Sequence, residues 1–506
     1  MKHPALFAGV AAVSAMAVLV ACSQSNSAPS AAGLGEDCVG EAGIPWDGTT
    51  AKTFACGSGT ALGPYVIVTA EQLAHFSFVV NSGDKNVSGK YFKLGADIAL
   101  NEGVLLGADG KLVGDPDSLL NWTPIGNDDV AFDGVFDGDG HVVSGMFIDA
   151  TGPNNGLFGN VSGTVRNVTV EDSWVRGGKY TGGIVGKNVG TVENATNRAT
   201  VSGTEYCVGG VVGYSDVKNY RDNSILKNLL NEGGVSGEKQ VGGVVGCASR
   251  VTADGLKNVA DVEGANIVGG AIGAIGGNSH NEIRNIANSG EAKGGCFVGG
   301  ISGACGGSQY IYSGDNPKSS FGCFKPSYVT MGCGKVERVR NDGEISGADF
   351  VGGVFGALCN AETEELANVG RIEGERYVAG VVGSSGYSTT RKMYNVGDVA
   401  GSVFVGGIFA ENREGIASAA YSTGEVSGDS LVGLMIGYGY GVTIADYYYL
   451  KRGEQPPFGL NDGGGEATAK NATEMKSAAF VELLGDGFVR SDAVNDGLPV
   501  FAWETE

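Results

Sequence analysis

A short glycine-rich motif returns about ten times along this 506-residue chain. It reads NGLFG from Asn155 and TGGIVG from Thr181. The later copies are VGGVVG from Val208 and from Val241, VGGAIG from Val268, VGGISG from Val298, VGGVFG from Val351, VAGVVG from Val378, VGGIFA from Val405 and VGLMIG from Val432. From Gly182 the steps are 27, 33, 27, 30, 53, 27, 27 and 27 residues, so a 27-residue unit repeats and three copies carry insertions. A fixed period of this size predicts a solenoid or a propeller.

The second half of each unit decides between these architectures. It reads VENATNRATVSG from Val192 and IRNIANSGEAKG from Ile283, which are short apolar and β-branched runs closed by Asn or Gly. Such runs are typical of short strands between tight turns, and the unit is shorter than a propeller blade. We therefore expect an all-β fold, a parallel β-helix (β-solenoid) of about ten 27-residue rungs with helix-containing caps at both ends. A recurring asparagine indicates an amide ladder at one corner, with members Asn194, Asn228, Asn258 and Asn285.

The anchor motif and its spacing resemble the GLUG motif of bacterial cell-surface proteins, which also occurs beside the protease domain of some IgA-cleaving metallopeptidases. The resemblance covers about residues 155–437 and extends to FDGVFDGDGHVVSGM before the repeats and GLPVFAW after them. It implies a repeat architecture and a cell-surface setting, and it implies no catalysis.

The start of the chain is typical of an export signal. A lysine is followed by an apolar run from Ala5 to Ala21, which is too short to span a membrane comfortably. Leu19, Val20, Ala21 and Cys22 resemble the lipobox of bacterial lipoproteins, which implies that Cys22 becomes an acylated N-terminus. Ser23 after it resembles the signal for release to the outer membrane, so the implied partner is a membrane, reached through a lipid anchor. The Ser, Ala, Asn and Pro residues that follow predict a flexible tether.

An N-terminal cap is expected after the tether. In an exported protein Cys38 and Cys56 are more often a disulfide than metal ligands. Thr69 to Asn81 is the best helix of the chain, since Thr69 and Gln72 have the spacing of a capping box. We expect this helix to cover the open end of the solenoid, whose strand edges would otherwise recruit other chains.

Five aspartates crowd one stretch before the repeats: Asp128, Asp129, Asp133, Asp137 and Asp139. Calcium is the cofactor that such oxygens would suit. The spacing lacks the closing Glu of an EF-hand and the nonapeptide repeat of calcium-binding β-rolls. Because tight turns select the same residues, turns are the favoured interpretation and no metal site is assigned.

The chain leaves the repeat near Asp446, where Tyr447, Tyr448 and Tyr449 are expected to supply bulky surface. A short amphipathic helix over Thr473 to Leu484 and a last strand in GLPVFAW suggest a closing cap. The expected division is 1–21 lipoprotein signal peptide, 22–45 tether, 46–154 N-terminal cap and first coils, 155–443 repeat solenoid and 444–506 C-terminal cap.

The net charge of −22 argues against binding nucleic acid or anionic membrane surfaces, because both need clustered Lys and Arg. Ten cysteines minus Cys22 leave nine, so at least one has no disulfide partner within the chain. Cys305 and Cys359 fall near the same anchor glycine on successive rungs and are plausible neighbours. Further disulfide candidates are Cys323 and Cys333 in the long insertion, whereas buried thiols are the favoured interpretation for Cys207, Cys247 and Cys296.

No catalytic motif is present. The chain contains no HExxH, no GxSxG and no phosphate-binding GxxxxGK followed by Ser or Thr. A carbohydrate lyase or hydrolase remains the enzymatic alternative, because a β-helix can carry carboxylates stacked across neighbouring rungs. No such column departs clearly from the repeat, and the fold alone does not establish a function.

The three insertions lie at one point of the unit, over Tyr214 to Ile225, Ala274 to Glu282 and Ala304 to Lys335. Insertions at one point place their loops along one edge of a rod, and such an edge is often where partners bind. The longest insertion carries aromatic residues suited to stacking on sugars, anchoring a protein or packing on the rod. These candidate ligand-binding residues are Tyr310, Tyr312, Phe321, Phe324 and Tyr328.

These observations together predict a lipid-anchored outer-membrane protein at the cell surface. Its rod would serve adhesion or the binding of an extracellular glycan or protein. The alternatives are a carbohydrate-active enzyme on the same fold and a structural spacer without a ligand of its own.

Overall fold

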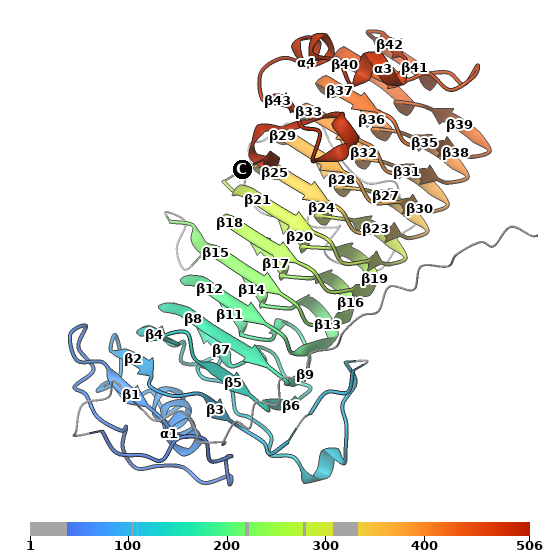
Figure 1. Ribbon diagram of the computed structural model, residues 1–506. Helices are drawn as coiled ribbons and strands as arrows, with labels where there is room; N and C mark the ends of the chain where they lie inside the picture. Colours follow the sequence, from blue (N-terminus) through green and yellow to red (C-terminus); the bar gives the residue numbers. More distant parts are fainter. Residues whose placement is uncertain are drawn as a thin grey trace, which may run out of the picture.

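The chain winds into an elongated parallel β-solenoid of about 13 turns (Figure 1). The computed structural model describes residues 38–505, apart from 104, 109, 218–221, 277–279 and 307–331. The predicted fold class is confirmed, but the rod is longer than ten rungs. Strand pairing begins at β1 (Tyr65–Ile67), before the first anchor motif, and continues to β42 (Ala467–Lys470), beyond the last. At about 4.8 Å per rung, 13 turns make a rod about 60 Å long.

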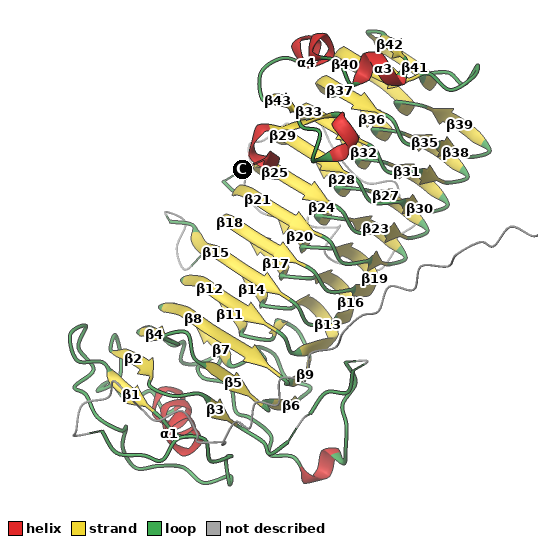
Figure 2. Ribbon diagram, in the orientation of Figure 1, coloured by secondary structure: helices red, strands yellow, loops and turns green. Residues whose placement is uncertain are grey.

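Equivalent strands of successive coils stack in parallel columns (Figure 2). The long-strand column begins with β1, and its other members are β2 (Tyr91–Leu94), β4 (Val135–Asp137), β8 (Thr164–Glu171), β12 (Thr191–Asn197), β15 (Ser224–Asn231), β18 (Val251–Asn258), β21 (Glu282–Asn288), β25 (Gly334–Asn341), β29 (Ala361–Asn368), β33 (Thr389–Asn395), β37 (Ile416–Ser422), the second half of β40 (Ile436–Leu450) and β42. The anchor-strand column contains β7 (Phe158–Val161), β11 (Val185–Asn188), β14 (Val212–Ser215), β17 (Val245–Ser249), β20 (Ile272–Gly276), β24 (Ser302–Cys305), β28 (Phe355–Cys359), β32 (Val382–Gly386), β36 (Phe409–Arg413), the first half of β40 and β41 (Phe458–Gly464).

The remaining strands of each coil form a second sheet. Its members are β6 (Phe147–Asp149), β9 (Trp174–Gly177), β10 (Thr181–Gly182), β13 (Thr200–Gly209), β16 (Val235–Gly242), β19 (Val262–Gly269), β22 (Ala292–Lys293), β23 (Cys296–Gly299), β26 (Ile345–Ser346), β27 (Asp349–Gly352), β30 (Ile372–Glu373), β31 (Arg376–Ala379), β34 (Val399–Ala400), β35 (Val403–Gly406), β38 (Val426–Ser427) and β39 (Ser430–Gly433). Near the N-terminal end, β3 (Ile98–Ala99) pairs with β5 (Val142–Ser144), and β5 joins the first sheet through its pairing with β8.

The 27-residue period is one turn of the chain, so each side chain lies over its equivalent in the previous coil. Val185 pairs with Val212, and Val212 with Val245. All three valines are fully buried. The core is therefore a set of stacked Val, Ile, Leu and Phe columns that runs the length of the rod. Stacking of like residues explains why the sequence repeats β-branched residues at fixed positions.

An inner ladder of asparagines closes one side of this core. Each member is fully buried and donates Nδ2 to the amide oxygen of the next, over 2.8–2.9 Å. The members are Asn197, Asn231, Asn258, Asn288, Asn341, Asn368 and Asn395. In the seven anchors that begin at Thr181 through Val378, the glycine at the third position faces this ladder, and a Cβ at Gly353 would overlap the amide of Asn368. The glycine and the asparagine therefore repeat together because they pack against each other.

The amide ladder expected from the sequence mixed two structural positions. Asn194 donates to Asn167 over 3.0 Å and accepts from Asn228 over 2.9 Å at an exposed corner. Gly255 follows in this corner column, and then Asn285. All of these residues have a φ between about 51° and 74°, which Asn and Gly tolerate best. Asn258 belongs to the inner ladder instead, so the assignment of Asn258 to the corner was wrong.

The N-terminal cap is built around helix α1 (Ala70–Asn81). Both hydrogen bonds of the capping box between Thr69 and Gln72 are present, which confirms the predicted start of this helix. Phe76 on its buried face stacks on Phe92 at 4.2 Å between ring centroids and also meets Phe132, Phe136 and Phe158 of the first coils. These contacts place α1 over the open end of the core, as expected.

The C-terminal segment differs from the expected closing cap. The solenoid continues through residue 470, so the segment that leaves it starts at residue 471 rather than 444. The expected single helix is two, α3 (Ala472–Met475) and α4 (Ala478–Leu484), and β43 (Phe488–Arg490) pairs antiparallel with β44 (Pro499–Phe501). Three short 3-10 turns complete the described elements, at Pro116–Ser118, Asn495–Gly497 and Ala502–Thr505.

This segment folds back along the flank of the rod (Figure 1). It packs on a column of buried tyrosines, Tyr394, Tyr421 and Tyr448. Glu504 accepts hydrogen bonds from Tyr394 and from Arg340 of β25. Tyr447, expected at the surface, points into the core instead, because the 27-residue register continues through β40.

Candidate functional site

All three insertions emerge at the same corner of the rod. They follow anchor strands β14, β20 and β24 and precede long strands β15, β21 and β25. The second and third insertions lie on directly neighbouring coils, and one coil, with β17 and β18, separates them from the first. The prediction that the insertions lie along one edge is thereby confirmed.

The described base of each insertion is held to the solenoid by a different set of hydrogen bonds or by a disulfide. At the first, the hydroxyls of Ser215 and Ser224 lie 2.9 Å apart and both side chains are buried. At the second, buried Asn281 donates to the carbonyls of Gly276 and Cys333 and accepts from the backbone of Val251. At the third, a disulfide joins Cys305 to Cys333. These bonds give the loops a rigid frame.

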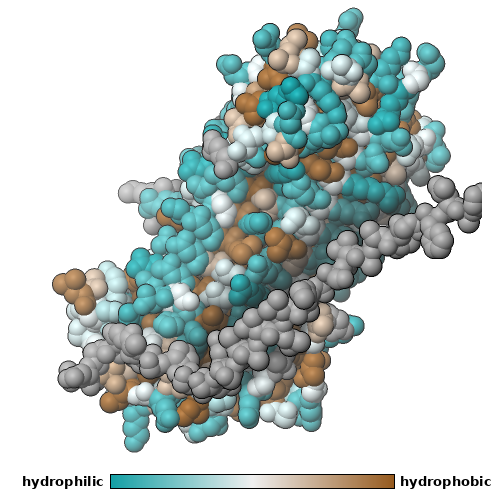
Figure 3. Space-filling model, in the orientation of Figure 1, coloured by the Kyte–Doolittle hydropathy of each residue, from teal (hydrophilic) through white to brown (hydrophobic). Residues whose placement is uncertain are grey.

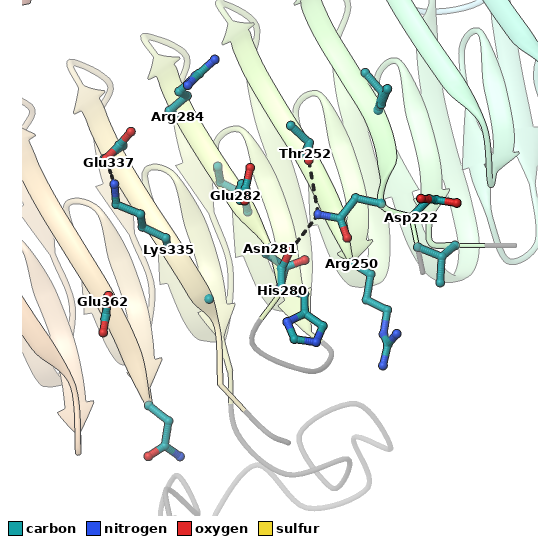
Figure 4. A pocket seen from close by; sticks show the side chains of 16 residues that line it. Asp222, Arg250, Thr252, His280, Asn281, Glu282, Arg284, Lys335, Glu337 and Glu362 are labelled. Carbon is teal, nitrogen blue, oxygen red and sulfur yellow. Dashed lines mark hydrogen bonds and ion pairs between the residues drawn. The ribbon is translucent and has the colours of Figure 1, made fainter. Parts of the chain in front are cut away.

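An open groove of about 1230 Å³ runs between the bases of the three insertions. We call this surface the edge groove. It is lined by Val217, Asp222, Asn223, Ile225, Arg250, Thr252, His280, Asn281, Glu282, Ile283, Arg284, Gly334, Lys335, Glu337, Asn360 and Glu362. Figure 4 shows these side chains standing on neighbouring long strands and on the insertion bases. Asn223 bridges two insertions, since it donates to Thr252 over 3.2 Å and to the His280 carbonyl over 2.8 Å.

Charges alternate from coil to coil on the long strands that carry the edge groove, where Arg284 and Glu337 line the groove and Asp254 contacts Arg284 without lining it. Asp254 pairs in register with Arg284, which in turn pairs with Glu337. Arg284 contacts Asp254 at 2.9 Å, and Lys335 contacts Glu337 at 2.5 Å. Opposite charges on directly opposed residues stabilise a parallel ladder modestly. The same arrangement gives the groove hydrogen-bond donors and acceptors in a regular row.

These pairs keep the groove ionised at neutral pH. Burial raises the pKa of Asp254, but hydrogen bonds from Arg284 and Asn285 outweigh it and hold that pKa below its usual value. The hydrogen bond to Glu337 raises the pKa of the Lys335 ammonium. The groove is therefore suited to binding polar or charged groups through fixed ionic side chains.

One feature that the sequence reasoning missed is a pair of stacked carboxylates. Glu337 and Glu364 lie directly opposite each other on β25 and β29, exactly one repeat apart in register. Each has its own cation, since Lys335 contacts Glu337 and Lys392 contacts Glu364 at 2.6 Å. The 27-residue spacing between the two glutamates was the signal for this column.

Several predicted site residues lie outside the described residues. These are the lipidation candidate Cys22, the disulfide candidate Cys323 and the aromatic candidates Tyr310, Tyr312, Phe321, Phe324 and Tyr328. Part of the tether, up to residue 37, lies outside them as well.

The cysteines pair differently from the expectation in two places. The predicted disulfide between Cys38 and Cys56 is present. Cys305 forms its disulfide with Cys333 rather than with Cys359. The reason is that Cys305 and Cys333 lie at the two ends of the same insertion. Cys207 and Cys247, expected as buried thiols, form a disulfide between neighbouring coils. Cys296 is a buried thiol near Asp349.

The aspartates before the repeats act in turns and ion pairs. Asp133 accepts from the Ser88 hydroxyl and the Gly89 amide, and Asp137 accepts from Arg166 and Asn167. Asp139 pairs with Lys93 at 2.9 Å. Among the described residues, no group of three or more His, Cys, Asp or Glu side chains is placed to hold a metal ion.

Comparisons with known proteins give partial matches. A search of protein families finds none that matches the chain. Halomucin of Haloquadratum walsbyi is 33% identical over 179 residues, which are 34% of this chain and 2% of halomucin. A "Putative Gly-rich membrane protein" of Evansella cellulosilytica is 32% identical over 151 residues, which are 29% of this chain and 16% of that protein. The matches thus span small parts of both relatives.

One solved structure is similar over most of the chain. It is titled as that of a "putative immunoglobulin A1 protease from Bacteroides ovatus", is 18% identical, and matches 89% of this chain and 95% of its own with a TM-score of 0.34. In the part of the chain that the structure describes, no helix is long and apolar enough to cross a membrane.

Proposed function

We propose that this chain is a surface-anchored lipoprotein whose solenoid is a rigid rod that binds a glycan or protein ligand along the edge groove. The observation that carries the proposal is the convergence of three insertions on one groove, each fixed at its base by separate bonds. Insertions that share an edge and bond to one another at their bases form one continuous surface, which is what a binding site requires.

The chemistry of the edge groove supports a polar ligand. Its floor presents carboxylates and cations in register at about 4.8 Å per coil, together with the amides and hydroxyls of Asn223 and Thr252. Fixed ionic side chains on a rigid scaffold bind hydroxyl-rich or charged partners with little loss of conformational entropy. A sugar polymer or an extended protein segment laid along the rod would meet several coils at once.

Binding is tested with the unacylated chain, residues 23–506, against immobilised plant, microbial and host polysaccharides and host surface proteins. The double variant Arg284→Ala, Lys335→Ala removes two cations of the groove. Arg371→Ala, Arg452→Ala is the matched control, since it removes one exposed and one partly exposed cation from ion pairs outside the groove. We expect the groove variant to lose retention at least tenfold while the control keeps it. Equal losses, or none, would exclude the groove as the binding site.

The lipid anchor rests on the lipobox-like sequence at Cys22, and the word "membrane" in the name of one relative is compatible with it. Several acyl chains on one residue would hold the protein firmly in an outer membrane. The test is fractionation of the full-length protein and of Cys22→Ala after expression in a diderm host. The anchor predicts that only the former incorporates labelled palmitate and sediments with outer membranes. A variant that still sediments would refute the proposed anchor.

A carbohydrate-active enzyme is the second candidate, favoured by the stacked carboxylates Glu337 and Glu364. The polysaccharide panel distinguishes it, because turnover releases oligosaccharides into solution. Release that is abolished in Glu364→Gln would establish catalysis at this column. Retention of the protein without release of oligosaccharide supports binding alone. If no probe retains the protein and none is cleaved, a spacer role is left.

A further inference from the structure

The N-terminal cap has an outer layer that faces away from the rod. Residues 38–62 pack on α1 at this end of the molecule, and their Trp46 and Phe54 also contact the edge of the solenoid core. Phe54 meets His75 at 5.0 Å between centroids, Ala51 donates to the carbonyl of Glu71, and Gln72 donates to the carbonyl of Val39. These contacts make residues 38–62, with the uncovered part of α1, the terminal surface of the molecule.

Large apolar side chains are exposed on this layer. Leu62 is fully exposed, Val39 and Phe78 are each 64% exposed, and Ile44 is 52% exposed. Phe78 is the one exposed residue among the twelve of α1. In Figure 3, apolar surface appears among polar residues at the cap end of the molecule. Four large exposed apolar side chains within this one cap are the composition expected of a surface that meets another apolar phase.

An apolar cleft of about 410 Å³ opens beside Phe78, and Trp46 and Trp122, which contact each other edge-to-face, both line it. The polar groups in its walls are engaged within the protein. Trp46 Nε1 donates to the Thr49 carbonyl over 2.7 Å, and Trp122 Nε1 donates to the Leu157 carbonyl over 3.2 Å. Asn81 donates to the Pro124 carbonyl and accepts from the Gly126 amide. The cleft therefore presents carbon to its occupant, which suits a hydrocarbon chain better than a sugar.

The length of the chain before this layer identifies the occupant. Fifteen residues, 23–37, separate Cys22 from Cys38, which the disulfide to Cys56 fixes to the cap. Fully extended, they span at most about 50 Å. If Cys22 carries the lipid anchor of the proposed function, the cap is the end of the rod held closest to the bilayer. Residues 38–120 carry nine Asp and Glu against five Lys and no Arg, which favours uncharged lipid headgroups over anionic ones.

We propose that the terminal surface of the cap seats directly on a zwitterionic lipid surface. Leu62 and Phe78 enter the interfacial region, and the cleft beside Phe78 receives an acyl chain. Aromatic side chains with one polar end are enriched at this depth of membranes. The contact orients the rod so that the edge groove is presented at a fixed angle. This inference rests on the proposed anchoring of the same chain.

The test uses the unacylated chain, residues 23–506, so that it is independent of the anchor. The protein is floated with vesicles of phosphatidylcholine and phosphatidylethanolamine, and Trp fluorescence is quenched with brominated lipids. We expect co-flotation at millimolar lipid, quenching, and a loss of about tenfold in partition for Phe78→Ser, since part of a Phe side chain leaves the lipid. Leu483→Ser is the control, because Leu483 is 47% exposed on the C-terminal segment. Both residues are exposed, so circular dichroism is expected to be unchanged.

Three outcomes would overturn the proposal. The first is that the unacylated chain does not float. The second is that Leu483→Ser weakens flotation as much as Phe78→Ser does. The third is a lipid-free dimer, detected by sedimentation velocity, that Phe78→Ser dissociates, since the surface would then bind a second copy. If the lipid anchor at Cys22 does not exist, the fractionation of Cys22→Ala shows it. The flotation experiment is unaffected, because it uses the unacylated chain.

Discussion

The inner ladder of asparagines makes a sharp prediction at Asn368. Its Nδ2 donates to the Gly370 carbonyl over 2.9 Å and to Asn395 over 2.8 Å, and its oxygen accepts from Asn341 over 2.8 Å. Asn368→Ala removes all three bonds in a site with no exposure to solvent. Two acceptors and one donor in the interior then lose a partner, at about 1–3 kcal/mol for each group left unsatisfied. We expect a total loss of about 3–5 kcal/mol.

The assay is thermal and urea unfolding of residues 23–506, followed by far-UV circular dichroism. The midpoint temperature should fall on the order of 5–10 °C. Asn194→Gly is the matched control, because Asn194 is an exposed ladder asparagine and the same column already holds Gly255 with the same backbone conformation. It should shift the midpoint by about 1 °C or less. Equal shifts in the two variants would refute the reasoning that burial makes the inner ladder important.

Three further predictions test other parts of the account. Gly353→Ala should destabilise the rod by about 2–4 kcal/mol in the same unfolding assay, because its Cβ would overlap the amide of Asn368, and an unchanged midpoint would contradict this packing. Burial raises the pKa of the Tyr447 phenol well above its ordinary value. The stability that this shift contributes is complete below about pH 10 and is lost as the pH rises above it, so Tyr447→Phe should be more resistant to alkaline unfolding than the wild type. Burial, together with the nearby carboxylate of Asp349, raises the pKa of the Cys296 thiol to about 11. At pH 8, iodoacetamide should therefore alkylate Cys296 at least tenfold more slowly than it alkylates the thiol of free glutathione. Comparable alkylation rates would refute the burial of Cys296.

The repeat was readable from the sequence because each 27-residue unit is one turn of the solenoid. Positions that face the core, such as Val185 and Val212, recur at that spacing, and stacking of identical coils leaves few alternatives. The same register predicted that the insertions share an edge. The number of turns was underestimated because the first and last coils keep the strand pairing but lose the anchor motif.

The sequence motif alone did not show whether a given side chain points into the core or toward the surface. Asn258 and Asn285 lie in equivalent strands, β18 and β21, yet their positions differ by three residues within the unit, and only Asn258 is buried. The disulfide between Cys207 and Cys247 also depends on where each side chain points on two neighbouring coils, and the spacing of the two residues in the sequence does not give this. The edge groove required the register of the strands, since Asp254, Arg284 and Glu337 become neighbours only when the coils are stacked.

Hydrogen exchange with a bound ligand tests the central claim most directly. The unacylated chain is exchanged alone and with whichever polysaccharide or protein it retains, and peptides are compared along the rod. We expect protection concentrated in peptides that contain Thr252, Glu282 and Lys335, on three neighbouring coils of the edge groove. Protection confined to the second sheet, at β26 and β30, would contradict it.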